Sequence, residues 1–271
     1  MNPFRQLIRA AGPHPPIGTM IVSASPIVAE ATGHAGFDWG VIDMEHAPAD
    51  TMHVLQILQA VGNTKMVPVV RVPWNEPVMV KRVLDAGAAT VLFPFVQNAD
   101  EAAHAVASTR YPPRGVRGIS HMSRASKYGA APNYVGSADA DMGVIVELET
   151  PQALERLEEI AAVPGVDALF IGPADLSASM GHVGRFAHPE VLQAMADAAR
   201  RCRAAGIPLG TVGGSADVVT QYRAMGFRFI AVSSDLGLLM AGARAAVRAL
   251  RMGGGETHVH SLDGGTRTDA G

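Results

Sequence analysis

Short apolar runs alternate with longer helix-like stretches along nearly the whole chain. The runs are rich in Val, Ile and Leu and predict eight strands, at 16–23, 39–44, 66–72, 90–94, 143–149, 168–172, 207–211 and 228–233. The other stretches predict eight helices, at 26–36, 50–61, 76–87, 98–109, 151–162, 189–205, 215–226 and 236–251. Eight strand–helix pairs in about 250 residues predict a (β/α)₈ TIM barrel, an α/β fold. A doubly wound open sheet is the alternative.

Two segments fall outside a minimal barrel. Residues 110–142 form a long insert after the fourth predicted helix, and long structured loops in compact domains are often functional. Residues 253–271 are rich in Gly, Thr and Asp, which predicts a disordered tail. Residues 1–252 are therefore expected to form a single catalytic barrel domain.

The composition of the 271 residues narrows the range of partners and compartments. A hydrophobic fraction of 48% can supply a large core, and a net charge of −3 gives no basic field for nucleic acid or an anionic membrane. No apolar run reaches the roughly 18 residues of a membrane span. The N-terminus lacks the long apolar centre of a signal peptide, so a cytoplasmic protein is expected. Cys202 is the only cysteine and is interpreted as structural.

Polar residues gather where the predicted strands end, which is where a barrel places its catalytic groups. The second strand leads into Asp43, Glu45 and His46. Three titratable groups within four residues are poorly explained by a solvated loop with a capping acid. The third strand carries Arg71, whose fork suits a carboxylate or an enolate oxygen. A structural ion pair with a nearby acid is the alternative for Arg71.

The fifth strand, GVIVELET, is the most informative. Val144, Val146 and Leu148 share one face and are expected to point toward the helices. Glu147 and Glu149 share the other face and then point into the barrel. Paired interior acids require a cation, a proton or an arginine.

Asp175 follows the Gly-Pro turn that ends the sixth strand. Adjacent strands would let Glu149 and Asp175 share one ion, although Asp175 could serve only as a helix N-cap. Two carboxylates suit a hard divalent cation such as Mg²⁺ or Mn²⁺, with Co²⁺ or Zn²⁺ as alternatives. None of the three lysines, at 65, 81 and 127, follows a predicted strand. A metal-stabilised enolate is therefore favoured over a Schiff base.

Six motifs carry a resemblance to a known family: GFDWGVIDMEHAP, VVRVPWNEP, KRVLDAGAATVLFPFVQNADEA, RYPPRGVRG, VIVELET and PGVDALFIGPADLSASMG. Together they span about residues 17 to 240. At these residues the chain resembles the HpcH/HpaI aldolases, the metal-dependent class II pyruvate aldolases that include 4-hydroxy-2-oxo-heptane-1,7-dioate aldolase. The resemblance implies reversible aldol cleavage between pyruvate, or a related 2-keto acid such as hydroxypyruvate, and an aldehyde.

The resemblance also implies roles for individual residues. Glu149 and Asp175 would bind the metal, and Arg71 would hold the keto oxygen. His46 would be the main acid/base group, with Asp43 nearby to orient it. The substrate carboxylate would meet the backbone N–H groups of the turn Gly172, Pro173, Ala174 and Asp175, among which Pro173 has none.

Subunit assembly is implied in the same way. Asp85 is expected to reach the His46 region of a neighbouring subunit. The family forms homo-hexamers, trimers paired face to face, with an exchanged C-terminal helix that would correspond to the apolar stretch 236–250. Glu147, counted with the substrate-binding residues, departs from the family's usual Gln, and an ionised carboxylate cannot donate the hydrogen bond that an amide can.

Three other functions compete with this interpretation. A citrate-lyase-like enzyme acting on acyl-CoA is the nearest. A phosphate-binding barrel isomerase draws weak support from TVGGS at 211–215, after the seventh strand. A barrel that only binds a ligand or partner would leave the polar strand ends unexplained.

Overall fold

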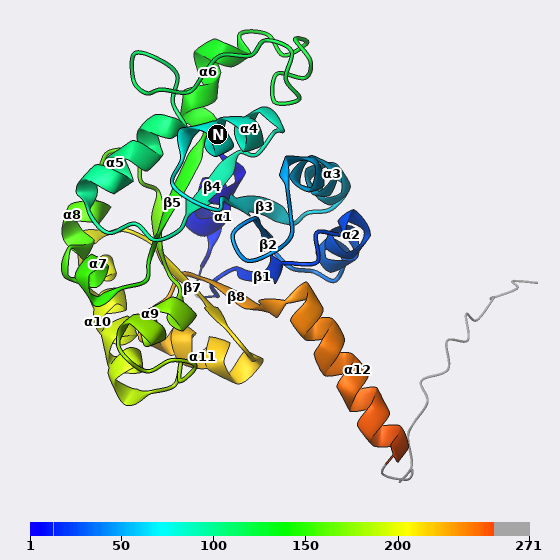
Figure 1. Cartoon of the computed structure of the whole chain (residues 1–271), viewed down its shortest axis with the longest axis vertical. Helices are drawn as coiled ribbons and strands as arrows, with labels where there is room; N and C mark the ends of the chain where they lie inside the picture. The colour runs from blue at the N-terminus through cyan, green and yellow to red at the C-terminus, as the bar shows by residue number, and fades with distance from the viewer. Residues whose placement is uncertain (13, 252–271) are drawn as a thin grey trace, which may run out of the picture. The chain divides into compact units, whose positions relative to one another are not determined.

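The chain folds into a closed barrel of eight parallel strands whose order in the sheet follows the sequence (Figure 1). The computed structural model describes residues 1–12 and 14–251. The strands are β1 Ile17–Ile21, β2 Trp39–Asp43, β3 Val67–Arg71, β4 Thr90–Phe93, β5 Gly143–Leu148, β6 Ala168–Ile171, β7 Leu209–Gly213 and β8 Phe229–Ser234. All eight predicted strands and the (β/α)₈ barrel are confirmed. The doubly wound open sheet is wrong, because β1 pairs with β8 and closes the ring.

Helices follow the strands as predicted, and side-chain caps fix where many of them begin. They are α2 Pro26–His34, α3 Thr51–Val61, α4 Pro77–Asp85, α5 Ala99–Ser108, α10 Pro189–Ala205, α11 Ala216–Met225 and α12 Asp235–Arg251. Asp50, for example, accepts hydrogen bonds from the first backbone N–H groups of α3 and satisfies donors that have no partner within the helix. The helix predicted at 151–162 is divided at Arg156 into α7 Pro151–Glu155 and α8 Leu157–Ala161.

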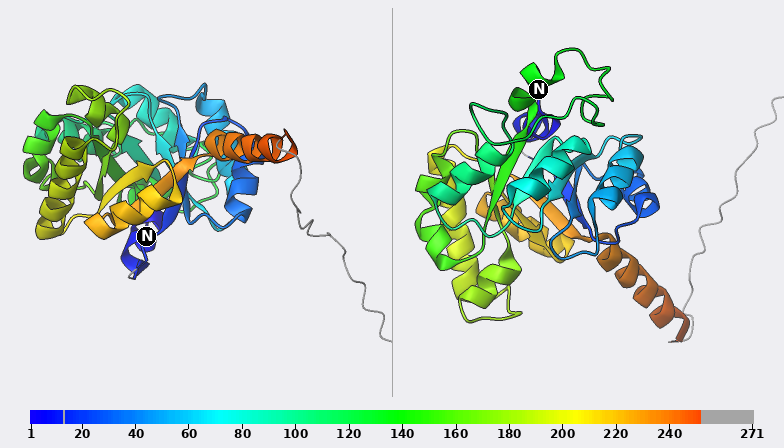
Figure 2. Two further views of the ribbon diagram at one scale, coloured as in Figure 1. Left: turned by 90° about the horizontal axis from the view of Figure 1, so that it is seen from below. Right: turned by 45° about the horizontal axis from the view of Figure 1, so that its top comes forward.

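Three helices were not predicted: α1 Pro3–Ala10, α6 Tyr134–Asp141 and α9 Pro173–Ser179. Helix α1 closes the N-terminal end of the barrel (Figure 2). Its Phe4 ring packs edge-on against Trp39 and Phe229, with ring centroids 6.0 and 5.2 Å apart. The Asn2 side chain caps this helix and Pro3 begins it, so a local start signal was present in the sequence.

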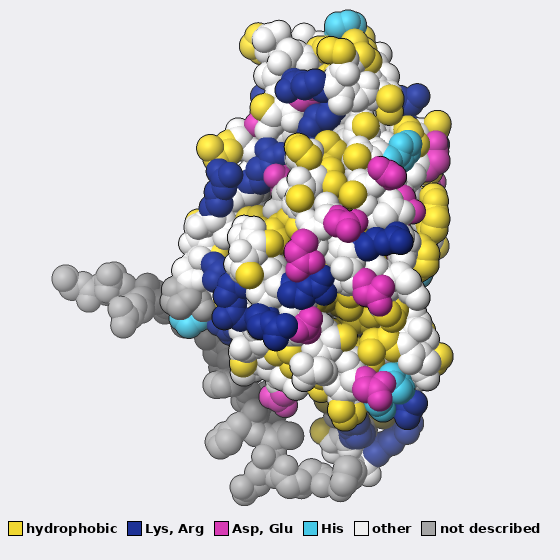
Figure 3. Space-filling view, turned by 90° about the vertical axis from the view of Figure 1, so that its left-hand side faces the viewer, with side chains coloured by type: hydrophobic (Ala, Val, Ile, Leu, Met, Phe, Trp, Pro, Cys, Tyr) yellow, Lys and Arg dark blue, Asp and Glu magenta, His cyan; other side chains and the backbone are white. Residues whose placement is uncertain are grey.

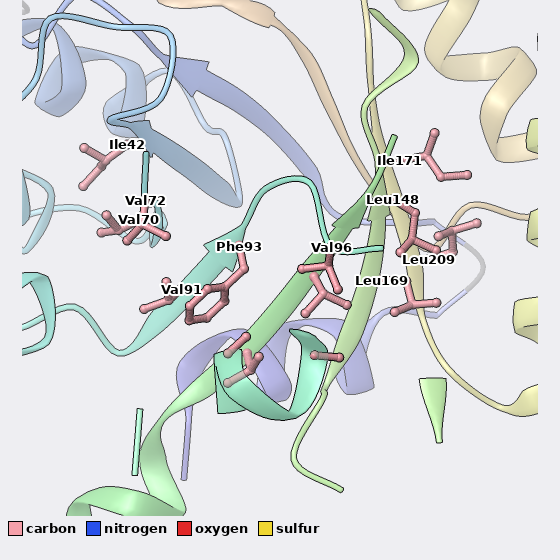
Figure 4. Packing of buried hydrophobic residues seen from close by; sticks show 14 of the residues in the cluster. Ile42, Val70, Val72, Val91, Phe93, Val96, Leu148, Leu169, Ile171 and Leu209 are labelled. Atoms are coloured by element: carbon pink, nitrogen blue, oxygen red, sulfur yellow. The ribbon is translucent and has the colours of Figure 1, made fainter. Parts of the chain in front are cut away.

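The apolar core has an outer and an inner layer. The outer layer lies between the strands and the helices and includes Ile42, Val70 and Phe93 (Figure 4). The inner layer fills the barrel, where Trp39 and Phe229 are so large that the neighbouring strands carry glycine. A Cβ on Gly18 would lie 2.3 Å from the Trp39 ring, and one on Gly210 would lie 2.2 Å from Phe229. Each large side chain buried in this way stabilises the fold by roughly 1.5–3 kcal/mol.

The insert at 110–142 joins the end of α5 to the start of β5, so it lies at the N-terminal end of the barrel. It packs against the end of α4. Arg124 donates to the Ala86 carbonyl (3.0 Å), and the backbone N–H of Ala125 donates to the Asp85 carbonyl (3.2 Å). Within one chain the insert is therefore remote from the C-terminal ends of the strands.

The chain divides into two compact units, Met1–Leu236 and Gly237–Gly271. The described part of the second unit continues helix α12 as far as Arg251 and carries exposed apolar side chains, namely Leu238, Leu239, Met240, Val247 and Leu250. The predicted tail at 253–271 lies outside the described residues. In residues 1–12 and 14–251, no helix is long and apolar enough to cross a membrane. On the face shown in Figure 3, basic and acidic side chains are intermixed and neither sign forms a continuous surface.

Candidate active site

Asp43 and Arg71 form a two-point ion pair at the C-terminal end of the barrel. They are register partners at the ends of β2 and β3. Arg71 Nε lies 3.0 Å from Asp43 Oδ1, and Nη2 lies 2.8 Å from Oδ2. Asp43 is only 1% exposed and Arg71 8%. The alternative interpretation of Arg71 was a structural ion pair with a nearby acid. It is correct for the Nε and Nη2 edge of the guanidinium, which pairs with Asp43.

The outer edge of the Arg71 guanidinium faces two further acids. Its Nη1 lies 3.1 Å from Glu45 Oε2 and 3.5 Å from Glu147 Oε2. Burial alone would lower the pKa of Arg71, but the charges of Glu147, Asp43 and Glu45 outweigh it and raise that pKa. Arg71 therefore keeps its charge, with Asp43 on one edge of the guanidinium and Glu45 and Glu147 beside the other.

Glu147 and Glu149 point into the barrel, as predicted. Val144, Val146 and Leu148 belong to the outer layer of the core, which leaves the alternate positions of β5 facing inward. Both glutamates are buried, and Glu149 Oε2 accepts a hydrogen bond from the backbone N–H of Phe95 at 3.0 Å.

Gly172 lies close against these two carboxylates. A Cβ at this position would lie 2.4 Å from Glu149 Oε1 and 2.9 Å from Glu147 Oε1. Any side chain at 172 would therefore collide with both acids. Only glycine lets the end of β6 approach both acids this closely.

The site contains more negative charge than one arginine can balance. Burial raises the pKa of Glu149, and the charges of Glu147, Glu45 and Asp175 raise it further. Burial also raises the pKa of Glu147, although Arg71 opposes the shift. Carboxylates in such a group retain a proton unless a cation replaces it.

The donor chemistry fits a hard divalent cation. Asp175 lies in the first turn of α9, and its charge acts on both Glu45 and Glu149. The N-cap of that helix is Gly172, so Asp175 is not the N-cap residue. Carboxylate oxygens are ligands that suit Mg²⁺ or Mn²⁺.

His46 lies at the mouth of the site, with its side chain 58% exposed. Its ring Nε2 is 3.6 Å from Glu45 Oε2, and its backbone N–H donates to Asp43 Oδ1 at 3.4 Å. Asp43 thus contacts the His46 backbone, whereas Glu45 is the acid beside the ring. The sequence placed Glu45 in the polar cluster with Asp43 and His46 but assigned it no role. Only the three-dimensional structure shows that Glu45 lies between Arg71 and His46.

Asp85 is remote from this group within one chain. It ends α4, at the opposite end of the barrel, and its Oδ1 accepts from Arg117 Nη2 at 3.0 Å. The structure therefore brings His46, Arg71, Asp43, Glu147, Glu149 and the 172–175 turn together, and leaves Asp85 apart.

A second group of metal-binding residue types lies in the loop before α10 and in the first turn of that helix, and sequence reasoning did not select it. The ligand atoms of His182, His188 and Glu190 lie within 4.8 Å of one another. These atoms already have partners. His182 Nε2 contacts Glu190 Oε2 (2.8 Å), its Nδ1 contacts Arg185 (3.0 Å), and His188 Nδ1 accepts from the N–H of Glu190 (3.4 Å). These contacts are explained by the capping of α10, in which His188 is the N-cap residue.

Comparison with known proteins identifies the family. Residues 17–241 match the family model of HpcH/HpaI aldolase/citrate lyase. The chain is 48% identical over 236 residues to the 2-dehydro-3,6-dideoxy-6-sulfogluconate aldolase of Pseudomonas putida, covering 87% of this chain and 92% of that protein. It is 44% identical over 245 residues to a pyruvate aldolase of Rhizobium etli, covering 90% and 96%.

A solved structure agrees. The crystal structure of an HpcH/HpaI aldolase/citrate lyase family protein from Burkholderia cenocepacia has a TM-score of 0.89 and 44% identity, covering 93% of this chain and 100% of that one. The chain belongs to the HpcH/HpaI aldolase/citrate lyase family. The resemblance drawn from the motifs and the prediction of an aldolase are confirmed, which favours carbon–carbon lyase chemistry over a phosphate-binding isomerase or a non-catalytic barrel.

Proposed function

We propose that this aldolase is divalent-metal-dependent and acts on pyruvate or a related 2-keto acid, with an aldehyde as the second partner. The observation that carries the proposal is the charge imbalance at the strand ends. One buried guanidinium, Arg71, faces three carboxylates, and Glu149 lies beside them with a raised pKa. The pyruvate aldolase among the relatives supports pyruvate as the donor.

Glu149 and Asp175 are proposed to hold the metal, with Mg²⁺ or Mn²⁺ preferred and Co²⁺ or Zn²⁺ as alternatives. When bound, the cation supplies Lewis acidity, which makes the C–H next to the keto group more acidic. The close approach of Gly172 to both glutamates supports this assignment, because it brings the 172–175 turn, and with it the charge of Asp175, beside Glu149.

Arg71 is proposed to bind the keto oxygen and to offset the negative charge that develops there. Asp43 fixes the Nε and Nη2 edge, so the guanidinium, with Nη1 beside Glu45 and Glu147, is oriented before substrate arrives. The backbone N–H groups of Gly172, Ala174 and Asp175 are proposed to bind the substrate carboxylate, since the first N–H groups of a helix have no partner within it.

His46 is proposed to move the proton at the carbon beside the keto group. Its exposed ring stands at the mouth, with Nε2 3.6 Å from Glu45 Oε2. Asp85 is proposed to act on His46 across a subunit boundary. This requires the homo-hexamer of two trimers with an exchanged C-terminal helix, for which the exposed apolar side chains of α12 provide support. A cytoplasmic location stays a prediction.

The proposal is tested by measuring pyruvate release from 4-hydroxy-2-keto acids. The enzyme is stripped of metal with a chelator and then restored with Mg²⁺ or Mn²⁺. Cleavage that is lost and then recovered supports metal dependence. Cleavage that is unaffected by the chelator contradicts it. Cleavage of an acyl-CoA thioester in place of the keto acid would favour the citrate-lyase-like alternative.

A further inference from the structure

A second cavity, of about 480 Å³, lies at the N-terminal end of the barrel, away from the aldolase site. It is formed where α10 and α11 end and where the chain enters β7 and β8. Arg203, Arg223 and Arg228 line it, together with apolar residues that include Ile8 and Phe227. None of the described residues that line it is acidic.

The three arginines have no carboxylate partner in the described part of the chain. Arg203 Nη2 donates to the Met225 carbonyl at 3.5 Å, and Arg228 Nη2 donates to the Ala11 carbonyl at 3.3 Å. Arg223 Nη2 contacts His14 Nδ1 at 2.9 Å. Each guanidinium carries five N–H donors, so most of them remain available to a ligand.

The ends of two helices explain the positions of two of the three arginines. Arg203 and Arg223 lie in the last turns of α10 and α11, where the helix dipole favours a cation. Arg228 lies outside both helices, just before β8, and that effect does not explain it. A Cβ on Gly226 would lie 2.8 Å from Arg203 Nη2, so the left-handed glycine leaves room for this guanidinium to reach across to the end of α11.

We propose that this cavity binds a small phosphate ester or a pyrophosphate group. Guanidinium forks match phosphate oxygens in pairs, and three of them converge on one cavity in a chain whose net charge is −3. The volume falls within the range of about 300–1,000 Å³ that is usual for small-molecule sites. The apolar wall, including Ile8 and Phe227, would contact the carbon skeleton of an ester. The proposal is independent of the aldolase mechanism.

The test is isothermal titration of the full-length protein with pyrophosphate, and separately with orthophosphate, without added divalent metal. We expect one equivalent of pyrophosphate to bind. The variant Arg203→Gln/Arg228→Gln is expected to bind about tenfold or more weakly, because a hydrogen bond to a charged group contributes about 1.5–3 kcal/mol. The single variant Arg228→Gln, which leaves both helix ends intact, is expected to weaken binding in the same direction.

Two controls locate the binding. Arg200→Gln removes an exposed arginine of α10 that pairs with Asp197, and should bind as the wild type does. Arg71→Gln alters the aldolase site and should also leave binding unchanged. The proposal is overturned if the wild type binds neither anion, if Arg228→Gln and the double variant bind as tightly as the wild type, or if Arg71→Gln alone abolishes binding.

Discussion

Asp43 holds Arg71 through two hydrogen bonds, of 3.0 and 2.8 Å, and leaves Nη1 of the guanidinium beside Glu45 and Glu147. The two residues are register partners on neighbouring strands, so the barrel itself sets this geometry. A buried arginine held in this way is oriented before substrate arrives, which is the condition under which a fixed charge stabilises a developing anion.

Replacing Arg71 with Ala is expected to lower kcat by about 10²–10³, the usual effect of losing a charge-stabilising donor. Steady-state kinetics of pyruvate release would measure it. Arg71→Lys is the matched variant, since it keeps the charge but cannot keep the two-point contact with Asp43. It should fall between the wild type and Arg71→Ala. Turnover of Arg71→Ala within twofold of the wild type would remove Arg71 from the mechanism.

Gly172→Ala is expected to weaken metal binding, because its Cβ would lie 2.4 Å from Glu149 Oε1. Titration of metal-free protein with Mn²⁺, followed by electron paramagnetic resonance, would give the affinity directly. Gly214→Ala is the control, since a Cβ there meets nothing within 4 Å. If both variants bind Mn²⁺ as the wild type does, the proposed position of the metal is wrong.

Glu147→Gln is expected to retain aldolase activity, since an amide fits the space of the carboxylate and can donate a hydrogen bond to a ligand. The change also removes an acid whose pKa is raised by burial. The metal-free variant should therefore unfold at a higher temperature than the wild type at alkaline pH, and calorimetry would show the difference. Complete loss of turnover would instead demonstrate an essential role of its own for Glu147.

Metal binding is expected to strengthen as pH rises toward 9. Burial raises the pKa of Glu149 to about 9 in the metal-free chain. A raised carboxyl pKa stabilises the fold below the ordinary carboxyl pKa, and that contribution is lost as pH rises through the folded-state value. The cation binds the ionised form, so affinity should rise by up to about tenfold per pH unit below that value.

Calorimetry with and without Mg²⁺ at about pH 6.5 and about pH 8.5 tests this linkage. The gain in melting temperature on adding Mg²⁺ should be larger at the higher pH. An equal gain at both values would show that Glu149 releases no proton when the metal binds.

The barrel could be predicted from sequence because each strand is a short apolar run and the helices between them carry local start signals. The inward direction of Glu147 and Glu149 followed from the alternation along one strand. Helix α1 was missed because the contacts of Phe4 with Trp39 and Phe229 join distant parts of the chain, even though Asn2 and Pro3 mark its start.

The site could be predicted only as a set of strand ends. Which acid meets which edge of Arg71 depends on side-chain directions in three dimensions. That is why Glu45 was left without a role and why Asp43 was assigned to the ring of His46. The position of Asp85 beside Arg117 likewise depends on how the insert packs against α4, which local patterns do not encode.

The most direct test of the central claim is hydrogen–deuterium exchange at the methyl group of pyruvate in D₂O, followed by NMR. It requires no knowledge of the aldehyde. The account predicts exchange with Mg²⁺ or Mn²⁺ present, none after the metal is removed, and a strong reduction in Arg71→Ala. Exchange that persists in the metal-stripped enzyme, or its absence with either metal, would contradict a metal-dependent aldolase that uses pyruvate.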